Sequence, residues 1–473
     1  MNMERKRIYL CLAHMSEDGA EQRYVKEAFD TNWVVPLGPN VNGFEKDLEE
    51  FVNQNGKMEE LKNGSLSMRV VALSAGTAAV HLGLLNCGVK PGDEVIVQSF
   101  TFCASTHPVT YLGATPVLVD SEPDTWNIDP ELLEEAIKDR IAKTGKKPAA
   151  IVPVALYGMP YKADRIMEIA NKYGIPVVED AAEGFGSKYK GQVLGTFGKY
   201  GVLSFNGNKM ITTSGGGALI TANDDEWREI MMYATQYRES YPYYQHEKIG
   251  YNYRMSNICA GIGRGQMTVV NDHLAHHKHV QKMYEGLLAD VQGVHVHRQM
   301  SNEELVMSNG SEEMKKWISE HEDTPVYDSN YWLCTITIDE NVKVKGQEDA
   351  YKTIVTGAVG GAAGVIHAAE SAHTDCEPNA NVEAMRVALD KAQIEARPVW
   401  KPMHKQPVYC RGNVKIEKLK NESFICQTSE SSIAYINGVS EALFKVGMCL
   451  PAGPYVTDDD VRYIVDTIKA NIL

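Results

Sequence analysis

The chain has 473 residues, a formal net charge of −15 at pH 7 and an isoelectric point near 5.5. This length predicts two domains, and the acidic balance argues against a nucleic-acid partner or an anionic membrane surface. The nine cysteines form no CxxC pair and no His/Cys cluster at metal-ligand spacing, so we expect reduced thiols, no metal site and a cytoplasmic protein. No apolar run reaches membrane-spanning length.

Between about Arg69 and Ala222, short β-branched runs alternate with helix-like stretches, a pattern typical of a mostly parallel sheet covered by helices. The expected strands are Arg69–Leu73, Glu94–Gln98, Pro116–Asp120, Ala149–Leu156, Pro176–Glu179, Tyr200–Ser204 and Ala218–Thr221. A helix is expected over Tyr161–Tyr173, ending at Gly174. The first half of the chain is therefore predicted to be an α/β domain.

The pattern changes beyond about Gly265. A long helix is expected over Met267–Leu288, followed by polar, irregular segments such as Ser301–Thr324. The Gly/Ala-rich stretch Val355–Val365 is compatible with a flexible loop or with a packed helix of small residues, and we assign it no function. We therefore predict a large domain over residues 1–265, which includes the N-terminal segment, and a small C-terminal domain over residues 266–473.

The first chemical signal lies where the strand ending at Leu73 passes through Ser74-Ala75-Gly76-Thr77 into a helix. Small residues there leave backbone N–H groups open at a helix N-terminus, which attracts phosphate through those donors and the helix dipole. An ordinary N-cap by Ser74 or Thr77 explains the same residues. Taken alone, the segment favours that ordinary cap.

A second signal is Asp180, which follows the apolar strand in Ile175-Pro-Val-Val-Glu-Asp-Ala-Ala-Glu-Gly. Ligands of open α/β sheets bind at the carboxyl ends of strands. A carboxylate there suits a protonated pyridine nitrogen, because a positive ring is the better electron sink for a substrate carbanion. Capping of the next helix, or a metal or Rossmann-type site, remains an alternative.

The third signal is Lys209, in an Asn/Gly-rich turn between two apolar strands and followed by Gly215–Gly217. Short neighbours allow partial desolvation, which lowers a lysine pKa and frees the amine to attack a carbonyl. A loop lysine is more often a solvated surface residue. The order of a phosphate cup, a strand-end Asp, a Ser and a Lys instead favours a lysine that holds pyridoxal 5'-phosphate as a Schiff base.

The chain resembles the fold-type I aminotransferases of the DegT/DnrJ/EryC1/StrS family, which act on nucleotide-linked keto-sugars. The resemblance covers nearly the full length and is carried by Asn32–Pro39, Asp180–Glu183, Ser204–Lys209, Gly250–Asn257 and Arg397–His404. The last two segments are most similar to enzymes that aminate UDP-4-keto-6-deoxy-N-acetylglucosamine toward bacillosamine-type sugars. The resemblance implies a large cofactor-binding domain with a mostly parallel sheet and a smaller α+β domain.

The resemblance also implies roles for residues around the cofactor. Lys209 would form the Schiff base and Asp180 would pair with the pyridine nitrogen. Glu183 would lie near the ring hydroxyl, in a position often filled by Gln, so its hydrogen-bond role is open. The other implied contacts are stacking by Phe102 and phosphate binding by Ser74, Ala75 and Ser204.

Members of the family bring the asparagine of the Gly-Tyr-Asn-Tyr-Arg segment across from a second subunit. Asn252 therefore implies a homodimer with shared active sites. The ordinary alternatives are a turn residue at Asn252 and a core aromatic at Phe102, beside Phe100.

For the nucleotide sugar, the resemblance points to an N-terminal and a C-terminal segment. Within them Lys401 and His404 could bind the diphosphate, and Trp33 or Trp400 could pack on a sugar or base. Plain packing remains an alternative for the Trp and Met side chains. The residues of the two segments are Asn32, Trp33, Val34, Val35, Trp400, Lys401, Pro402, Met403 and His404.

The expected reaction is a transamination in two halves. An amino donor, L-glutamate by resemblance, gives up its nitrogen and leaves as 2-oxoglutarate, and a keto-sugar for surface-glycan synthesis takes the nitrogen up. Alternatives are a GDP-perosamine or dTDP-type sugar substrate, a regulatory protein that has lost catalysis, and a sugar dehydratase. Lys209 favours the aminotransferase over the last two alternatives, because such regulators can lack the lysine and related dehydratases carry histidine there.

Overall fold

The computed structural model describes residues 6–55, 67–308, 311–351, 376–410, 415–418, 423–429 and 432–473. The Gly/Ala-rich segment 355–365 lies outside these residues. Among the helices in the described ranges, none is both long and apolar enough to cross a membrane.

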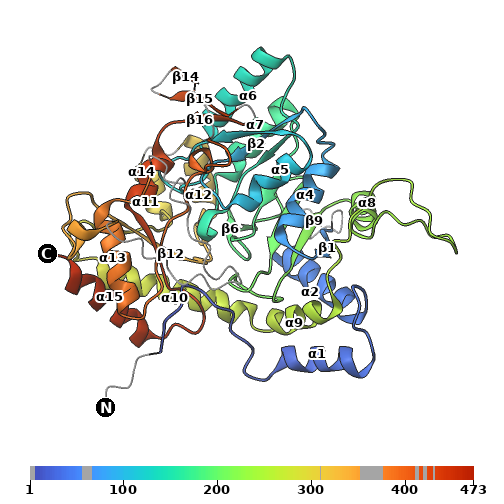
Figure 1. Cartoon of the computed structure of the whole chain (residues 1–473), viewed down its shortest axis with the longest axis horizontal. Helices are drawn as coiled ribbons and strands as arrows, with labels where there is room; N and C mark the ends of the chain where they lie inside the picture. Colours follow the sequence, from blue (N-terminus) through green and yellow to red (C-terminus); the bar gives the residue numbers. More distant parts are fainter. Residues whose placement is uncertain are drawn as a thin grey trace.

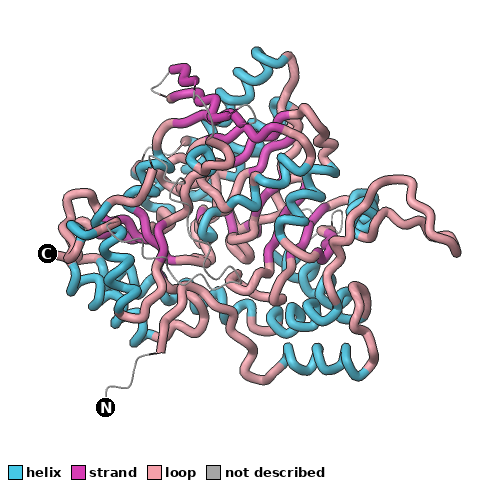
Figure 2. The backbone as a smooth tube through the Cα atoms, in the orientation of Figure 1, coloured by secondary structure: helices cyan, strands magenta, loops and turns pink. Residues whose placement is uncertain are grey.

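A central, mixed sheet organises the molecule (Figures 1 and 2). It consists of a four-stranded and a six-stranded part, which meet through parallel bridges from Ile151 to Val177 and from Val154 to Asp180. In spatial order the strands are β14 (Lys415–Lys418), β15 (Phe424–Ser429), β16 (Ser432–Ile436), β3 (Thr115–Val119), β2 (Glu94–Gln98), β4 (Ala150–Val152), β5 (Val178–Asp180), β8 (Tyr200–Ser204), β9 (Gly217–Thr221) and β1 (Arg69–Leu73). The strands from β16 to β8 are parallel, as the alternating sequence pattern predicts.

The expected strands compare well with those observed. Strands β1, β2 and β8 have the predicted bounds, while β3, β4, β5 and β9 begin or end at other residues than predicted. Strands β14, β15 and β16 had no counterpart in the prediction. They follow residue 265 yet complete the sheet of the first half, since β16 pairs in parallel with β3; the division at residue 265 stays a prediction.

Helices cover both faces of this sheet. Helix α4 (Gly76–Asn86) is buried from Ala78 to Leu84, because it is apolar on all sides and packs between the sheet and neighbouring helices. The others here are α5 (His107–Tyr111), α6 (Pro130–Thr144), α7 (Ala163–Tyr173) and α8 (Asp224–Ala234). Helix α7 ends at Gly174 with φ 60°, as its sequence predicts.

The N-terminal helices form a layer with α9 (Asn257–Met267) below the sheet (Figure 1). They are α1 (Ala20–Asp30) and α2 (Pro39–Asn55), and both pack on α9. Small residues permit this close packing: a Cβ added at Gly265 would lie 2.5 Å from the backbone nitrogen of Glu21.

A second, antiparallel sheet lies in the C-terminal half, in the order β10 (Val294–Val296), β12 (Cys334–Ile338), β17 (Gly447–Leu450) and β13 (Arg397–Pro398). It shares a hydrophobic core with the helices around it. Those helices are α10 (Val270–Leu288), α13 (Ala380–Lys391) and α15 (Asp458–Asn471), while α14 (Val439–Val446) also packs on this sheet but contributes Phe444 to the core of the central sheet. A small sheet of β11 (Tyr327–Asp328), β6 (Lys188–Tyr189) and β7 (Gln192–Val193) joins the two halves.

The expectation of an irregular segment over Ser301–Thr324 is wrong. The structure has helices α11 (Asn302–Met307) and α12 (Glu312–Glu320) there. Ser301 and Glu304 form a reciprocal capping box, and Ser311 caps α12, so both helices start at side chains that satisfy their first N–H groups. Ser301, Glu304 and Ser311 are therefore capping residues of regular helices.

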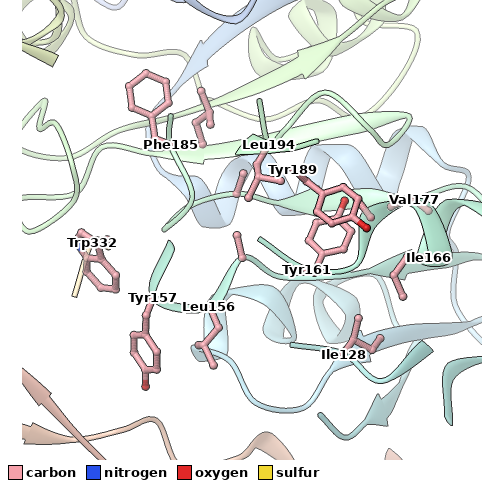
Figure 3. Packing of buried hydrophobic residues seen from close by; sticks show 14 of the residues in the cluster. Ile128, Leu156, Tyr157, Tyr161, Ile166, Val177, Phe185, Tyr189, Leu194 and Trp332 are labelled. Carbon is pink, nitrogen blue, oxygen red and sulfur yellow. The ribbon is translucent and has the colours of Figure 1, made fainter. Parts of the chain in front are cut away.

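The main core packs helices α2, α6 and α7 against the sheet, and Figure 3 shows a part of it. Tyr161, Ile166 and Val177 pack there with Tyr189 and Leu194, and all are buried. This rigid layer supports the turns at the carboxyl ends of β4 and β5, where the candidate site begins.

Candidate active site

A cavity of about 390 Å³ opens at the carboxyl ends of the parallel strands β5 and β8. It includes most of the expected cofactor residues and one of the expected substrate residues. Those that line it are Ser74, Ala75, Phe102, Asp180, Glu183, Ser204, Lys209 and Trp400. Their meeting follows from topology, because each segment leaves the sheet at the same edge or packs against it there.

The phosphate end of the cavity lies at the start of α4. The N-cap is Ala75, in extended conformation and without a side-chain cap, so the ordinary cap by Ser74 or Thr77 is not formed. A Cβ added at Gly76 would lie 2.9 Å from the Cβ of Ser204. Because Gly76 has no side chain, the Ser204 hydroxyl lies against the helix N-terminus, a favourable place for an anion.

Asp180 is the last residue of β5 and is almost completely buried. Ser105 Oγ donates to its Oδ2 (2.6 Å) and the Ala182 N–H to its Oδ1 (3.1 Å). Burial raises the pKa of Asp180, while these hydrogen bonds and the positive charge of Lys209 act in the opposite direction. The carboxylate is thus held in one orientation and is suited to a cationic partner in the cavity.

Lys209 lies in the turn between β8 and β9, with a side chain only 13% exposed. Its Nζ is 3.2 Å from Glu183 Oε1 and 3.9 Å from the ring centroid of Trp332. The other oxygen of Glu183, Oε2, accepts the Tyr157 N–H (2.8 Å). In this structure Glu183 therefore orients the lysine amine, while the aromatic face of Trp332 stabilises its positive charge.

Phe102 and Trp400 form an apolar side of the cavity. Phe102 is 54% exposed, in contrast to the fully buried Phe100, and its ring centroid is 6.0 Å from that of Trp400. A large aromatic side chain left this open is available to stack on a ligand.

The residues after Trp400 turn away from the cavity. Met403 and His404 are buried, and the His404 ring contacts Ser99 Oγ (2.7 Å, Nδ1) and Glu441 Oε1 (3.0 Å, Nε2). Burial lowers the pKa of Lys401, whose Nζ is 6.0 Å from the Phe444 ring centroid. Lys401, Pro402, Met403 and His404 do not line the cavity, and their substrate roles stay predictions.

The remaining expected residues lie at the surface. Asn32–Val35 are exposed, and Asn257 fixes their backbone through the carbonyls of Trp33 and Val35. Asn252 is also exposed and does not line the cavity of its own subunit.

Three residues at the site had not been singled out from the sequence. Ser105 follows Phe102 by three positions, so the same motif could have indicated it. Trp332 and Tyr157 stand in stretches without any motif, and only the fold brings them to Lys209 and Glu183.

The described residues fit pyridoxal phosphate. The uncapped start of α4 and Ser204 can bind the phosphate. The Asp180 carboxylate can pair with the ring nitrogen, and the Lys209 amine can bond to the aldehyde carbon. The cavity volume of about 390 Å³ also leaves room for a substrate beside the ring.

Comparison with known proteins agrees with this fit. A model of the DegT/DnrJ/EryC1/StrS aminotransferase family matches residues 15–320. EpsN of Bacillus subtilis strain 168, named as a pyridoxal phosphate-dependent aminotransferase, is 35% identical over 463 residues, covering 98% of this chain and 95% of that protein. The GDP-perosamine synthase of Caulobacter vibrioides is 40% identical over 272 residues, covering 58% of this chain and 68% of the synthase.

Among solved structures, a DegT DnrJ EryC1 StrS aminotransferase from Brucella abortus superposes with a TM-score of 0.71 at 22% identity, over 96% of this chain and 95% of that one. At this identity the likeness shows the fold. The chain therefore belongs to the DegT/DnrJ/EryC1/StrS aminotransferase family, has the predicted fold-type I architecture and uses pyridoxal phosphate as its cofactor.

Proposed function

We propose that the protein transfers the amino group of L-glutamate to a nucleotide-linked 4-keto-6-deoxy sugar, with UDP-4-keto-6-deoxy-N-acetylglucosamine as the first candidate. One observation carries this proposal. A single cavity holds the Lys209 amine, the buried Asp180 carboxylate and the uncapped N-terminus of α4, next to an apolar side formed by Phe102 and Trp400.

In this proposal Lys209 has two tasks. Its amine anchors the cofactor and, once released, moves a proton away from the reacting carbon of the donor and later onto that of the acceptor. Glu183 supports the second task, because its carboxylate accepts from Nζ and keeps the amine pointed into the cavity.

Pyridoxal phosphate, when bound, supplies an electron sink for the charge that develops at the substrate carbon. Asp180 would pair with the ring nitrogen, since Ser105 and Ala182 fix both of its oxygens. The α4 N-terminus and Ser204 would hold the phosphate and Phe102 would stack on the ring, so the reacting atoms would keep one geometry.

The decisive experiment is an amination assay with a panel of UDP-, GDP- and dTDP-linked 4-keto and 3-keto sugars and L-glutamate, scored by product mass. A mass gain that matches replacement of the keto oxygen by an amine, with 2-oxoglutarate released, supports the proposal. Turnover of none of these sugars contradicts it.

A GDP-linked 4-keto sugar is the second candidate. It is supported by the 40% identity to the GDP-perosamine synthase of Caulobacter vibrioides. The same panel separates the two, because the preferred nucleotide is the one with the higher kcat/KM.

The proposal includes a homodimer in which Asn252 of one subunit serves the cavity of the other. Asn252 follows an arm, residues 237–250, that projects from the body after α8 (Figure 1). The arm exposes Tyr241, Tyr243, Tyr244 and Ile249 to between 52% and 87%. Large apolar side chains this exposed favour burial against a second copy.

Mixed dimers test this sharing. Lys209→Ala and Asn252→Ala each impair their own homodimers, but a mixed dimer has one site with both residues intact if Asn252 acts across the interface. Co-refolding the variants in equal amounts should restore about a quarter of the wild-type activity by random pairing. Activity no higher than the mean of the two variants would show that Asn252 acts within its own subunit or not at all.

A further inference from the structure

Tyr157 has a backbone conformation that tyrosine rarely adopts. It lies in η2 (Leu156–Gly158) after β4, with φ 55° and ψ 16°, in the left-handed region. It is also buried and lies at one end of the main core, beside Trp332 (Figure 3). A side chain larger than Asn in this region indicates that the surroundings impose the conformation, and such positions cluster at functional sites.

The turn around Tyr157 is fixed from both sides. The Leu156 N–H donates to Asn127 Oδ1 (3.0 Å), and the Gly158 carbonyl accepts from Ser187 Oγ (2.7 Å) and Ser329 Oγ (3.0 Å). A Cβ added at Gly158 would lie 1.8 Å from Asn330 Oδ1. These bonds and the close approach at Gly158 fix the backbone on both sides of Tyr157, which has the left-handed conformation.

This conformation makes Tyr157 a bridge between two parts of the cavity. Its N–H donates to Glu183 Oε2 (2.8 Å), whose other oxygen holds Lys209. Its phenol oxygen accepts the backbone N–H of Trp400 (2.7 Å), and the two rings lie 5.6 Å apart. A glycine or asparagine would adopt the turn with less strain, but neither has a hydroxyl that reaches Trp400.

The bridge matters because the N–H of Trp400 itself bonds Tyr157, between the backbone bonds that Val399 and Met403 make to Gly447 and Ser99. Within the described chain, its indole Nε1 is buried without a hydrogen-bond partner. Its place at the cavity therefore depends on ring contacts and on the backbone bond to Tyr157. That bond also comes from a distant element, since Tyr157 follows β4 while Trp400 follows β13.

We propose that Tyr157 is a positioning residue, which sets the place of Trp400 relative to the Glu183–Lys209 pair and so determines how tightly the sugar substrate is bound. This inference rests on the proposed function, in which Trp400 forms the substrate side of the cavity. Tyr157 acts through Trp400 and through Glu183, and it does not itself line the cavity.

The test is Tyr157→Phe, which removes the phenol oxygen that bonds Trp400 and Cys449 and keeps the N–H to Glu183. The KM for the nucleotide keto-sugar should rise five- to tenfold, about the effect of one lost hydrogen bond, while kcat stays within about twofold. The visible absorbance of the lysine-bound cofactor, its pH profile and the half-reaction with glutamate should match wild type. An unchanged KM, or a fall in kcat alone, overturns the proposal.

A double-variant cycle separates positioning from general loosening. In a Trp400→Ala background there is no indole to place, so adding Tyr157→Phe should leave KM unchanged. An equal rise of KM in both backgrounds means that Tyr157 does not act through Trp400. Tyr284→Phe is the matched control, because the Tyr284 hydroxyl is also buried and donates to the Pro451 carbonyl (2.9 Å) in the other core.

Two outcomes remain distinct from these. If wild-type protein aminates none of the keto-sugars, the proposed function fails before the variants are compared. If Tyr157→Phe folds poorly, Tyr157→Asn tolerates the left-handed backbone and still donates its N–H to Glu183. It should keep the cofactor absorbance and show the same rise in KM. An Asn variant that loses the cofactor absorbance and shows no rise in KM would contradict the bridge.

Discussion

The two sides of the cavity are built differently. On the cofactor side, Ser74, Asp180, Ser204 and Lys209 each lie at or just after the end of a strand of the central sheet, and all four line the cavity. On the other side, Trp400 stands in a loop after β13, and His404 a few residues later is buried in a network of its own. The carboxyl end of a sheet strand places a motif residue at the cavity. In a loop, the direction of each side chain depends on its own packing contacts.

The largest expected effect tests the cofactor side. Lys209→Ala should lower kcat by at least about 10³-fold, because the anchoring amine and the proton carrier are lost together. The visible absorbance of the lysine-bound cofactor should disappear as well. Lys199→Ala is the control, since Lys199 forms a half-exposed pair with Glu226 (3.1 Å) and should keep both activity and colour.

A smaller loss is expected for Asp180→Asn, about 10²-fold in kcat, because the amide still accepts from Ser105 but no longer stabilises a cationic ring nitrogen. Spectroscopic titration should show that the cofactor still binds. Asp164→Asn serves for comparison, because Asp164 bonds Tyr189 and Lys190 outside the cavity. An Asp180→Asn enzyme of wild-type rate would mean that the strand-end rule identified the wrong partner.

The substrate side should respond in KM. Trp400→Ala removes an aromatic surface and should raise the KM for the nucleotide keto-sugar about tenfold, with less than about threefold change in kcat. Steady-state kinetics at saturating glutamate measure this. If kcat falls instead and KM stays, Trp400 belongs with the catalytic side and the contrast between the two sides disappears.

His404→Ala should instead affect stability. It leaves Ser99 and Glu441 without their histidine partner and should lower the free energy of unfolding by about 2 kcal/mol. The KM for the sugar should change less than about twofold. Denaturant unfolding against His279→Ala, whose exposed ring pairs with Asp458 (2.8 Å), measures the difference. A KM rise at unchanged stability would place His404 among the substrate contacts after all.

The smallest expected effect is on the pH dependence of stability. Burial alone would raise the pKa of Glu441, but hydrogen bonds and charges of His404 and Lys405 outweigh it and hold the pKa at about 2, below the ordinary 4.5. Since the folded value is the lower one, Glu441 stabilises the protein above pH 4.5, and this contribution is lost as the pH falls toward 2.

Glu441→Gln should therefore reduce the slope of the unfolding free energy against pH on the acid side by at most about one proton. The partly exposed position of Glu441 reduces the effect. Unfolding free energies at pH 5.5 and pH 3.5 check this, with the exposed Glu322→Gln as control. If the unfolding free energy of Glu441→Gln falls as steeply between pH 5.5 and pH 3.5 as that of wild type, the carboxylate does not take part in the His404 network.

Local patterns were enough to predict the cofactor side. The bounds of β1, β2 and β8 and the cap at Gly174 follow from β-branched runs and a C-terminal glycine, and these elements place Ser74, Ser204 and Lys209. The helices over Ser301–Thr324 were missed although their capping serines are visible in the sequence. That error came from taking polarity as irregularity.

Other features had no local signal. Trp332 reaches Lys209 from a distant part of the sequence, and Tyr157 owes its role to a left-handed backbone that nothing in its neighbours predicts. The burial of His404 depends on Ser99 and Glu441, which lie hundreds and tens of positions away. Long-range packing decides such positions, so the substrate side was the less predictable of the two.

The parallel pairing of β16 with β3 also bears on how the protein is made. Asn437 N–H donates to Asp120 Oδ2 (3.2 Å) across 317 positions of the sequence, so the edge of β3 stays open until the ribosome has passed β16. Contacts this distant form slowly, and an unpaired strand edge can recruit another chain. A product that stops before Ser432 exposes that edge, whereas a chain that continues through β16 has β14, a strand of four residues, at that margin of the sheet.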